Sequence, residues 1–410
     1  MSLKLWHKVI IGMVLGAICG FIFGKDAEIL KPIGTIYINC LKMVIVPLIF
    51  FAVLYGVTNI SDASTLGRVG LKALSIYSCT TIFAVTTGLL FASFFKPGIG
   101  ININLEIDPN KHEKTKELSD ILMNIIPSNP VEAMATSNTL QIVVFAFFTG
   151  FCLVLIGERG REVKNFVSSA AHLVFKMIEL IIKLTPYGVF AIMAWVIGEH
   201  GLGVMVALSK FLYVVLAALF TQYMIFGVLL SIVGLKPWPF YRKMVDIQTM
   251  AFATSSSKAT LALSMQDVHN KLGVSKETVG FVLPLGASMN MDATAIYLGI
   301  TTVFFAQIIG MTLTPAQYCV VIFTATIGSI GAAGFPGGGI VMMSMVLSSV
   351  GIPLECISII IGIDRILDMI RTTINITGDC AVTVIVDKLE NTLDKKRYYA
   401  KLEDIKNKVF

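Results

Sequence analysis

The chain has 410 residues, of which 55% are hydrophobic and 14% charged, and its formal net charge at pH 7 is +6. Soluble domains carry about a quarter charged residues, and disordered chains need low hydrophobicity, so this composition excludes both classes. The apolar residues come in blocks, and about 20 residues cross a bilayer, so the sequence predicts an all-α polytopic membrane protein.

The positive charge lies mainly in short loops between the apolar blocks, where lipid headgroups attract Lys and Arg. No basic stripe interleaved with aromatic residues is present, so a nucleic-acid partner is not expected. The seven cysteines are scattered singly, a pattern that indicates neither a zinc site nor a disulfide framework. The first apolar run has no clear small-residue cleavage site, so a retained first helix is predicted.

Six apolar segments in the first part of the chain predict spans. They cover about 6–24, 33–58, 69–95, 140–156, 166–197 and 204–235. The fifth segment carries Lys176, Glu179 and Lys183 and is interrupted by Pro186, so we expect it to be amphipathic and kinked.

Basic residues set the expected orientation. With a cytoplasmic N-terminus, the inside loops contain Arg68 with Lys72 and the basic groups near 159–164 and 236–243. The long polar segment 96–135 then becomes an extracellular loop, and residues 387–410 become a cytoplasmic tail with a helical pattern. Both termini are predicted to be cytoplasmic, in the cell membrane.

Two later segments are interrupted at their centres. Residues 250–265 place two short apolar arms around a Ser/Thr-rich centre, and residues 324–350 repeat the design around a Gly-rich centre. Irregular backbone at membrane depth survives only beside protein or a water-filled cavity. Paired interruptions of this kind indicate a transporter binding site, the alternative being two loops that dip into the interface.

Polar residues inside two late spans carry the chemistry. Asn290 and Asp292 lie in an apolar run after Pro284 and Gly286, where oxygen atoms and freed carbonyls suit a sodium ion. Asp292 taken alone is weak evidence, because a lone Asp in a span could pair with a neighbouring Lys.

The last span is more informative. Asp364, Asp368, Arg371, Asn375 and Asp379 fall within an arc of roughly 80° on one helix face. An Asp binds an ammonium group, an Arg clamps a carboxylate and an Asn bonds a second carboxylate, which together suit an acidic amino acid. A salt-bridged seam between helices is the alternative.

These motifs, in this order, resemble the dicarboxylate/amino acid:cation symporter family, which includes the glutamate and aspartate transporters. The resemblance rests on the segment around Leu41–Leu48, Thr254–Ser257, Asn290–Thr294, the Gly-rich Ala333–Gly339 and the stripe of the last span. It implies eight transmembrane helices, two re-entrant hairpins, inverted repeats and a homotrimer in the lipid bilayer.

The resemblance also implies an elevator mechanism and a division of the chain. A scaffold would comprise about 1–68 and 136–235, and a mobile transport part would comprise about 69–95 and 236–386. The second hairpin, through Phe335–Gly339, would act as the extracellular gate.

The substrate-binding residues that the resemblance implies are Ser255, Ser256, Ser257, Thr294, Phe335, Gly339, Asp368, Arg371, Thr372 and Asn375. One sodium ion would be bound by Gly286, Asn290, Asn375 and Asp379. A second would be bound by Ser288 and the carbonyls of Ser329, Ile330 and Ala332. A third would be bound by Tyr77, Thr80, Thr81, Asn290 and Asp292. No organic cofactor is expected.

The chain departs from the family pattern at several positions. Ala293 replaces a common Gly, and Ser255 stands where archaeal relatives carry an Arg, while Arg365 lies about one turn from Asp368. Lys258 is unusual at the hairpin tip, and we expect it to reach cytoplasmic water, the alternative being an effect of its charge on substrate affinity. Leu298 replaces the Glu of animal proton-coupled relatives, which disfavours that proton route.

The expected function is sodium-coupled uptake of L-aspartate and/or L-glutamate. The alternatives of the same fold are proton-coupled glutamate/aspartate symport, C4-dicarboxylate uptake and neutral amino acid transport. No Ser/His/Asp set, metal-ligand cluster or phosphate loop is recognisable, so the chain is not expected to be an enzyme. A channel would need a pore lined along its length rather than one compact site.

Overall fold

The computed structural model describes residues 5–58, 68–100, 126–136, 138–201, 203–331 and 338–402. Throughout these ranges the regular secondary structure is helical. The first half contains α1 Leu5–Phe23, η1 Gly24–Leu30, α2 Lys31–Thr58, α3 Arg68–Phe95, α5 Pro130–Ala135, α6 Thr139–Leu155, η3 Gly157–Gly160, α7 Arg161–Ile182, α8 Thr185–His200 and α9 Gly203–Ile232. The second half contains α10 Pro237–Lys243, α11 Val245–Thr254, α12 Ser257–Leu272, α13 Lys276–Met289, α14 Asp292–Ile308, α15 Pro315–Gly331, α16 Gly338–Ser349, η4 Leu354–Cys356, α17 Ile357–Leu389 and α18 Lys395–Tyr399.

The six apolar segments of the first half form helices close to the predicted bounds. The fifth is divided into α7 and α8, whose axes differ by 52° between Gly157–Ile181 and Thr185–Glu199. Pro186 lies at the start of α8, where its missing N–H costs no helical hydrogen bond. The predicted kink is therefore confirmed, and it is sharp enough to make two helices.

Five stretches of the described residues are long and apolar enough to cross a membrane, or six if the bent pair α7/α8 counts as one span. One of these stretches, His7–Tyr55, contains both α1 and α2. The all-helical membrane architecture is as expected, whereas the number of eight spans with two re-entrant hairpins remains a prediction.

Two groups of helices differ in how deeply they are buried. In the most apolar window of Lys276–Ile308, which covers α13 and α14, 94% of residues are buried, and in that of Ile363–Leu389 on α17 the share is 89%. The share is only 38% for His7–Tyr55. Helices α13, α14 and α17 therefore form the centre of the molecule, with α3, α9, α11 and α12 packed against them.

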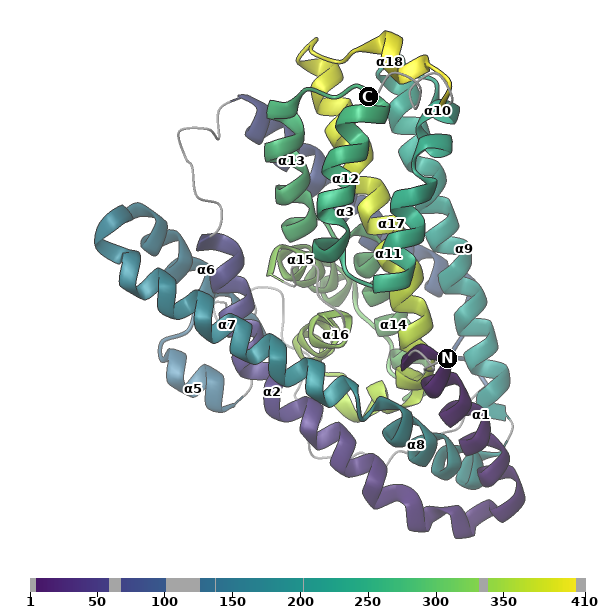
Figure 1. Cartoon of the computed structure of the whole chain (residues 1–410). Coiled ribbons are helices and arrows are strands. Elements are labelled where there is room, and N and C mark those ends of the chain that lie inside the picture. The colour runs from purple at the N-terminus through teal and green to yellow at the C-terminus, as the bar shows by residue number, and fades with distance from the viewer. Residues whose placement is uncertain are drawn as a thin grey trace.

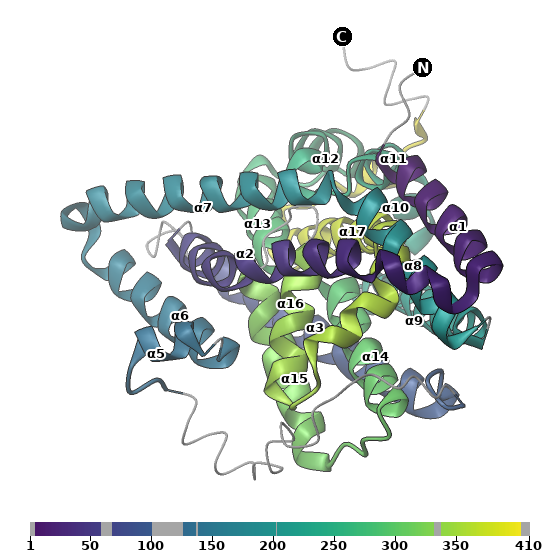
Figure 2. The same ribbon diagram turned by 90° about the horizontal axis from the view of Figure 1, so that it is seen from below.

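A peripheral group lies beside this central bundle. Helix α2 packs against α6, α7 and α8, and α1 packs against α8. Figure 1 shows α2 and α7 running obliquely past the upright bundle of α9, α12 and α17, and Figure 2 shows α1 and α6 at opposite edges. Apolar side chains such as Leu15, Phe94 and Ile232 are exposed on the outer helices, as side chains in contact with lipid would be.

Close packing of α1 on α8 depends on small residues. Gly12, Gly16 and Gly20 recur every four residues along one face of α1, and a Cβ at each would overlap a backbone carbonyl of α8. Small residues at this spacing let two helix backbones come into direct contact. In lipid there is no hydrophobic driving force between helices, so such close packing stabilises their association.

The chain end is fastened to the bundle by buried polar contacts. Lys243, at the end of α10, donates from Nζ to the carbonyls of Arg397 and Tyr398, both at 2.7 Å. Tyr398 donates to the carbonyl of Lys236 at 3.0 Å, and the amide of Asp394 donates to the carbonyl of Gly273 at 2.9 Å. We call this set of contacts the C-terminal clasp.

The clasp corrects the expectation of a helical tail over residues 387–410. Asp387 belongs to α17 and is buried, and Ser275 donates to it through Oγ at 2.6 Å. Asn391 adopts a left-handed φ of 63°, which ends the helical path, and only the short α18 follows within the described residues. The remainder, 403–410, lies outside them.

Replacing Lys243 by Met tests the clasp. Burial lowers the pKa of the Lys243 ammonium to about 8, and its two carbonyl partners offset that cost. Losing hydrogen bonds from a charged donor costs about 1–3 kcal/mol, so we expect faster amide hydrogen exchange across residues 393–400. The exposed Lys276→Met is the control, and unchanged exchange in Lys243→Met would show that the clasp does not depend on this cation.

Candidate functional site

The centre of the site is a break between two buried helices. Helix α13 ends at Met289 and α14 begins at Asp292, and Asn290 between them has an extended backbone with φ −102° and ψ 105°. Pro284 inside α13 has no N–H for the carbonyl of Gly280, and the last turn of α13 leaves further carbonyl oxygens without helical donors, so backbone oxygens are available to a ligand. Gly286 is needed here, because a Cβ at this position would overlap the Tyr77 hydroxyl and lie 2.8 Å from Asp379 Oδ1.

Asn290 connects the break to the last long helix. Its Nδ2 donates to Asp379 Oδ1 at 2.9 Å, and both residues are buried. Asp379 Oδ2 and Asn290 Oδ1 have no hydrogen-bond partner among the described residues. Two unpartnered, buried oxygen acceptors in one place suit a hard cation better than they suit a closed core.

A second acidic group, Asp292, lies two residues after Asn290 in the sequence. Asp292, which is fully buried, accepts hydrogen bonds from Thr81 Oγ1 at 2.8 Å, Thr80 Oγ1 at 3.3 Å and Gln222 Nε2 at 3.1 Å. Tyr77, one turn before Thr81 on α3, donates to the carbonyl of Val282 at 3.2 Å. The structure therefore joins three of the five residues predicted for the third cation, Thr80, Thr81 and Asp292, with Gln222 as a further hydrogen-bond donor.

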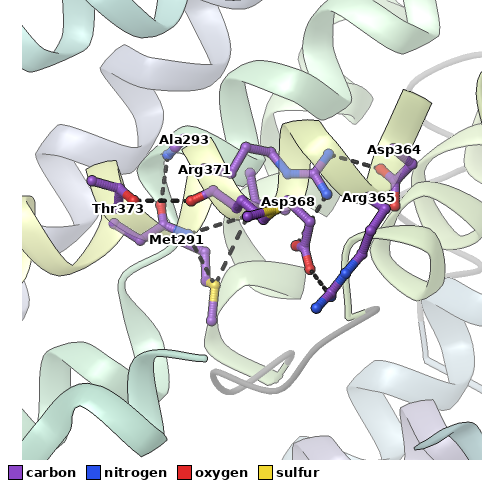
Figure 3. A network of polar contacts seen from close by, with 10 residues as sticks. Met291, Ala293, Asp364, Arg365, Asp368, Arg371 and Thr373 are labelled. Atoms are coloured by element: carbon purple, nitrogen blue, oxygen red, sulfur yellow. Dashed lines mark hydrogen bonds and ion pairs between the residues drawn. The ribbon is translucent and has the colours of Figure 1, made fainter. Parts of the chain in front are cut away.

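Asn375 on α17 joins the same break from the other side. Its Oδ1 accepts from the amide of Ala293 at 2.8 Å, and its Nδ2 donates to Thr294 Oγ1 at 3.3 Å. Figure 3 shows these contacts next to Met291 and Arg371. A backbone amide at the first turn of α14 is thus satisfied by a side chain of α17, which locks the two helices in register.

In the part of α17 that precedes Asn375, four charged side chains lie close together, as Figure 3 shows. Arg371 donates to Asp364 Oδ1 at 3.0 Å and to Asp368 Oδ1 at 3.2 Å, and Arg365 donates to Asp368 Oδ2 at 3.4 Å. The guanidinium carbon of Arg371 also lies 4.0 Å from the centroid of the Tyr297 ring. We refer to Asp364, Arg365, Asp368 and Arg371 as the charge quartet.

The quartet is neutral overall but deeply buried. Arg371 is 1% exposed and Asp368 9% exposed. A buried charge is tolerated only when it is paired and hydrogen-bonded, and the Nε of Arg371 still has no partner among the described residues. The arrangement is costly for a structural seam, because packed apolar residues would hold two helices at least as well.

The first interrupted segment forms two short helices, α11 and α12, which pack on each other and on α17. Ser255 joins them in a left-handed conformation with φ 51°, is buried, and its Oγ has no partner among the described residues. Ser256 caps α12 by accepting from the amide of Ala259 at 3.2 Å, and Ser257 begins that helix and is buried. A non-Gly residue at positive φ marks a strained turn, which is typical of a ligand site.

The second interrupted segment is described only at its ends. Phe335 and Ala332 lie outside the described residues, while Ile330 lies in the last turn of α15. Ser329 donates to the carbonyls of Thr326 at 2.7 Å and Met289 at 3.4 Å. Gly339, in the first turn of α16, lies against the quartet, because a Cβ there would be 2.8 Å from Arg371 Nη2.

Two further residues predicted for the site, Thr372 and Ser288, lie on α17 and α13. Thr372 is buried on α17 beside Arg371, and Ser288 is half-buried in the last turn of α13.

Sequence reasoning did not assign three residues that complete these groups. Asp364 was noted in the polar stripe without a role, yet it accepts the shortest hydrogen bond of Arg371 in the quartet. Tyr297 and Gln222 were not singled out, although both are fully buried. The sequence feature that could have indicated Tyr297 and Gln222 is a polar side chain inside an otherwise apolar span. Such a group is energetically unfavourable there unless it contacts a polar partner.

Comparison with known proteins gives a consistent result. The sequence profile of the sodium:dicarboxylate symporter family matches residues 5–389. The chain is 31% identical over 395 residues to the proton/sodium-glutamate symport protein of Bacillus subtilis (strain 168), covering 93% of this chain and 92% of the relative. It is 32% identical over 407 residues to the C4-dicarboxylate transport protein of the same strain, covering 97% and 96%.

A C4-dicarboxylate transport protein of Anaeromyxobacter sp. (strain K) is 33% identical over 414 residues, covering 97% of this chain and 92% of the relative. A profile match over nearly the whole chain, together with a buried site that carries both charge signs, leads to one conclusion. The chain belongs to the sodium:dicarboxylate symporter family, a family of integral membrane transporters.

Proposed function

We propose that this transporter takes up L-aspartate and/or L-glutamate together with sodium ions. The observation that carries the proposal is the charge quartet, which holds two carboxylates and two guanidinium groups within hydrogen-bond distance of one another. Such a set recognises a molecule that itself carries both charge signs, because each substrate charge takes the place of an internal group of the same sign.

Arg371 is the proposed clamp for the side-chain carboxylate of the substrate. In the structure its guanidinium is shared between Asp364 and Asp368, and the Tyr297 ring lies over its face. A substrate carboxylate that takes Arg371 frees Asp368, which then accepts the substrate ammonium. Asp364 stays with Arg371 and keeps the guanidinium oriented, and Asn375 with the hydroxyls at 255–257 is proposed for the α-carboxylate.

Uptake of C4-dicarboxylates is the second candidate function. It is favoured by the presence of two guanidinium groups, Arg365 and Arg371, and by relatives named as C4-dicarboxylate transport proteins. A dicarboxylate has no ammonium, however, so Asp368 would remain as a repelling charge beside the ligand. This residue therefore separates the two candidates.

Sodium is the proposed coupling ion, with protons as the alternative that the names of the glutamate relatives leave open. One site is proposed around the unpartnered oxygens of Asn290 and Asp379, and another around Asp292 with Thr80 and Thr81. Ser288 with the carbonyls at the end of α15 is proposed for the remaining ion. Sodium takes oxygen ligands, which these side chains and freed carbonyls supply.

Transport is proposed to proceed by movement of the central helices past the peripheral ones, within a homotrimer whose chain termini face the cytoplasm. The contrast between the buried α13, α14 and α17 and the lipid-exposed α1 and α2 supports two units of this kind. Helix α9 packs against α14 and α17, and Gln222 on α9 donates to Asp292. Because of these contacts we propose that α9 belongs to the mobile unit. The sequence-based division assigned residues 136–235, which include α9, to the scaffold.

Replacing Arg371 by Met should abolish uptake of aspartate and glutamate into proteoliposomes. Losing a buried charged partner costs about 2–5 kcal/mol, so the apparent affinity should fall by a factor of at least 30, and neutral amino acids should begin to compete. Arg161→Met, at the exposed start of α7, is the control. Normal aspartate uptake by Arg371→Met would contradict the assigned clamp.

Replacing Asp368 by Asn distinguishes amino acids from dicarboxylates. The change keeps the side-chain volume and removes the charge that an ammonium requires, so aspartate uptake should fall while succinate uptake stays absent or rises from a low level. Uptake of labelled aspartate, glutamate and succinate is measured side by side. If the wild type prefers succinate and Asp368→Asn enhances that uptake, the dicarboxylate function replaces the one proposed.

Coupling to sodium is tested with a sodium gradient and, separately, with a proton gradient alone. Full uptake on the proton gradient would exclude the sodium mechanism. Thr81→Val removes the hydroxyl nearest Asp292 without changing shape, and we expect about a tenfold higher sodium concentration at half-maximal uptake. Thr86→Val is the matched control, because that hydroxyl donates only within its own helix, to the carbonyl of Ile82.

A further inference from the structure

Lys258, in the first turn of α12, lies over aromatic rings of two other helices. Its Nζ is 5.3 Å from the ring centroid of Tyr55 on α2 and 5.6 Å from that of Phe175 on α7. Both distances are within the range at which an ammonium is attracted to the face of an aromatic ring. Lys258 therefore has ring partners that the sequence did not predict, and the expectation that it reaches cytoplasmic water stays a prediction.

The rings around Lys258 form an ordered group. Tyr55 packs edge-to-face on His172 at 5.6 Å and on Phe175 at 6.3 Å, and His172 packs edge-to-face on Phe175 at 6.3 Å. The His172 ring is fixed in turn, because its Nδ1 donates to the carbonyl of Ser168 at 2.6 Å. We call Tyr55, His172 and Phe175 the aromatic cage.

The cage is the partner that the structure provides for this cation. Among the described residues, the partners shown for the Lys258 ammonium are the rings of Tyr55 and Phe175, and its side chain is only partly exposed. An ammonium group that has lost part of its water gains more from a ring than a fully hydrated one does, so the contact is stronger here than on an open surface.

The contact joins the two groups of helices. Tyr55 and Phe175 belong to α2 and α7, which pack on each other in the peripheral group, whereas α12 packs on α11, α13 and α17 of the central group. Figure 1 shows α7 and α2 passing beside the bundle that contains α12. Lys258 also follows directly after Ser255–Ser257, so a docked lysine holds the turn on which those hydroxyls are presented.

We propose that Lys258 is a docking residue, which holds the tip of the α11/α12 pair in the aromatic cage and thereby favours the arrangement of the two helix groups seen here. The inference rests on the proposed movement of the central helices past the peripheral ones. When the tip moves along α2 and α7, the ammonium must leave the rings. The aromatic cage therefore stabilises the arrangement at one end of that movement relative to the other.

The experiment measures amide hydrogen exchange in the full-length protein in lipid nanodiscs, without substrate or sodium gradient. In Lys258→Met, which keeps the length of the side chain without its charge, peptides covering residues 252–263 and the end of α2 should exchange about ten times faster. Lys258→Arg keeps a cation and should behave like the wild type. Lys276→Met, an exposed lysine on α13, is the matched control for loss of one charge.

The rings are tested by a second pair of variants. Tyr55→Phe keeps the ring and should leave exchange unchanged, whereas Tyr55→Leu should reproduce the effect of Lys258→Met. The double variant with Lys258→Met should exchange no faster than either single variant, because both remove the same contact. Additive effects, or a Lys258→Met variant that exchanges like the wild type, would overturn the proposal.

The readout separates this proposal from the transport function. Exchange is measured without transport, so loss of the Lys258 effect contradicts docking even in a protein that imports aspartate normally. A protein that does not import aspartate but shows the coupled effect of Lys258 and Tyr55 retains the docking contact and contradicts only the proposed substrate. Docking that favours one end of the movement also predicts that Lys258→Met changes the ratio of inward to outward net transport rates of aspartate relative to the wild type.

Discussion

The rest of the structure depends on one constraint, the cost of keeping the Arg371 guanidinium away from water. Its neighbours meet that cost in different ways: Asp364 and Asp368 accept its hydrogen bonds, Tyr297 presents a ring face, and Gly339 leaves the space that a side chain would fill. A buried guanidinium is tolerated only with such partners, and two of the helices that supply them, α14 and α17, are themselves almost completely buried.

The same principle organises the break between α13 and α14. Asn290, Asn375 and Asp292 tie the break between α13 and α14 to α17, α3 and α9, so the interrupted backbone is supported on every side that the structure describes. Irregular backbone at this depth is tolerable only with such support. The charge quartet and the break between α13 and α14 are therefore connected through α17, which carries Arg371, Asn375 and Asp379.

Local patterns in the sequence were sufficient for the helices and for much of the site. Hydropathy predicted the spans to within a few residues, Pro186 predicted the bend between α7 and α8, and helical spacing predicted the stripe on α17. Pairings between distant segments were not predictable in this way. Tyr55 and Phe175 read as ordinary apolar positions until α12 brings Lys258 to them, and the end of the chain appears as a free amphipathic tail until Lys243 is placed beside it.

The pairing of Asn290 with Asp379 has a consequence for how the protein is made. The two residues are separated by 89 positions, so Asn290 and its neighbour Asp292 enter the membrane well before α17 has been synthesised. At roughly 5–20 residues per second, the ribosome needs roughly 4 to 18 seconds to supply the missing partner. During that interval α13 and α14 cannot rest in lipid as a finished span. Asn290 therefore gains the carboxylate that accepts its hydrogen bond only after α17 has been added.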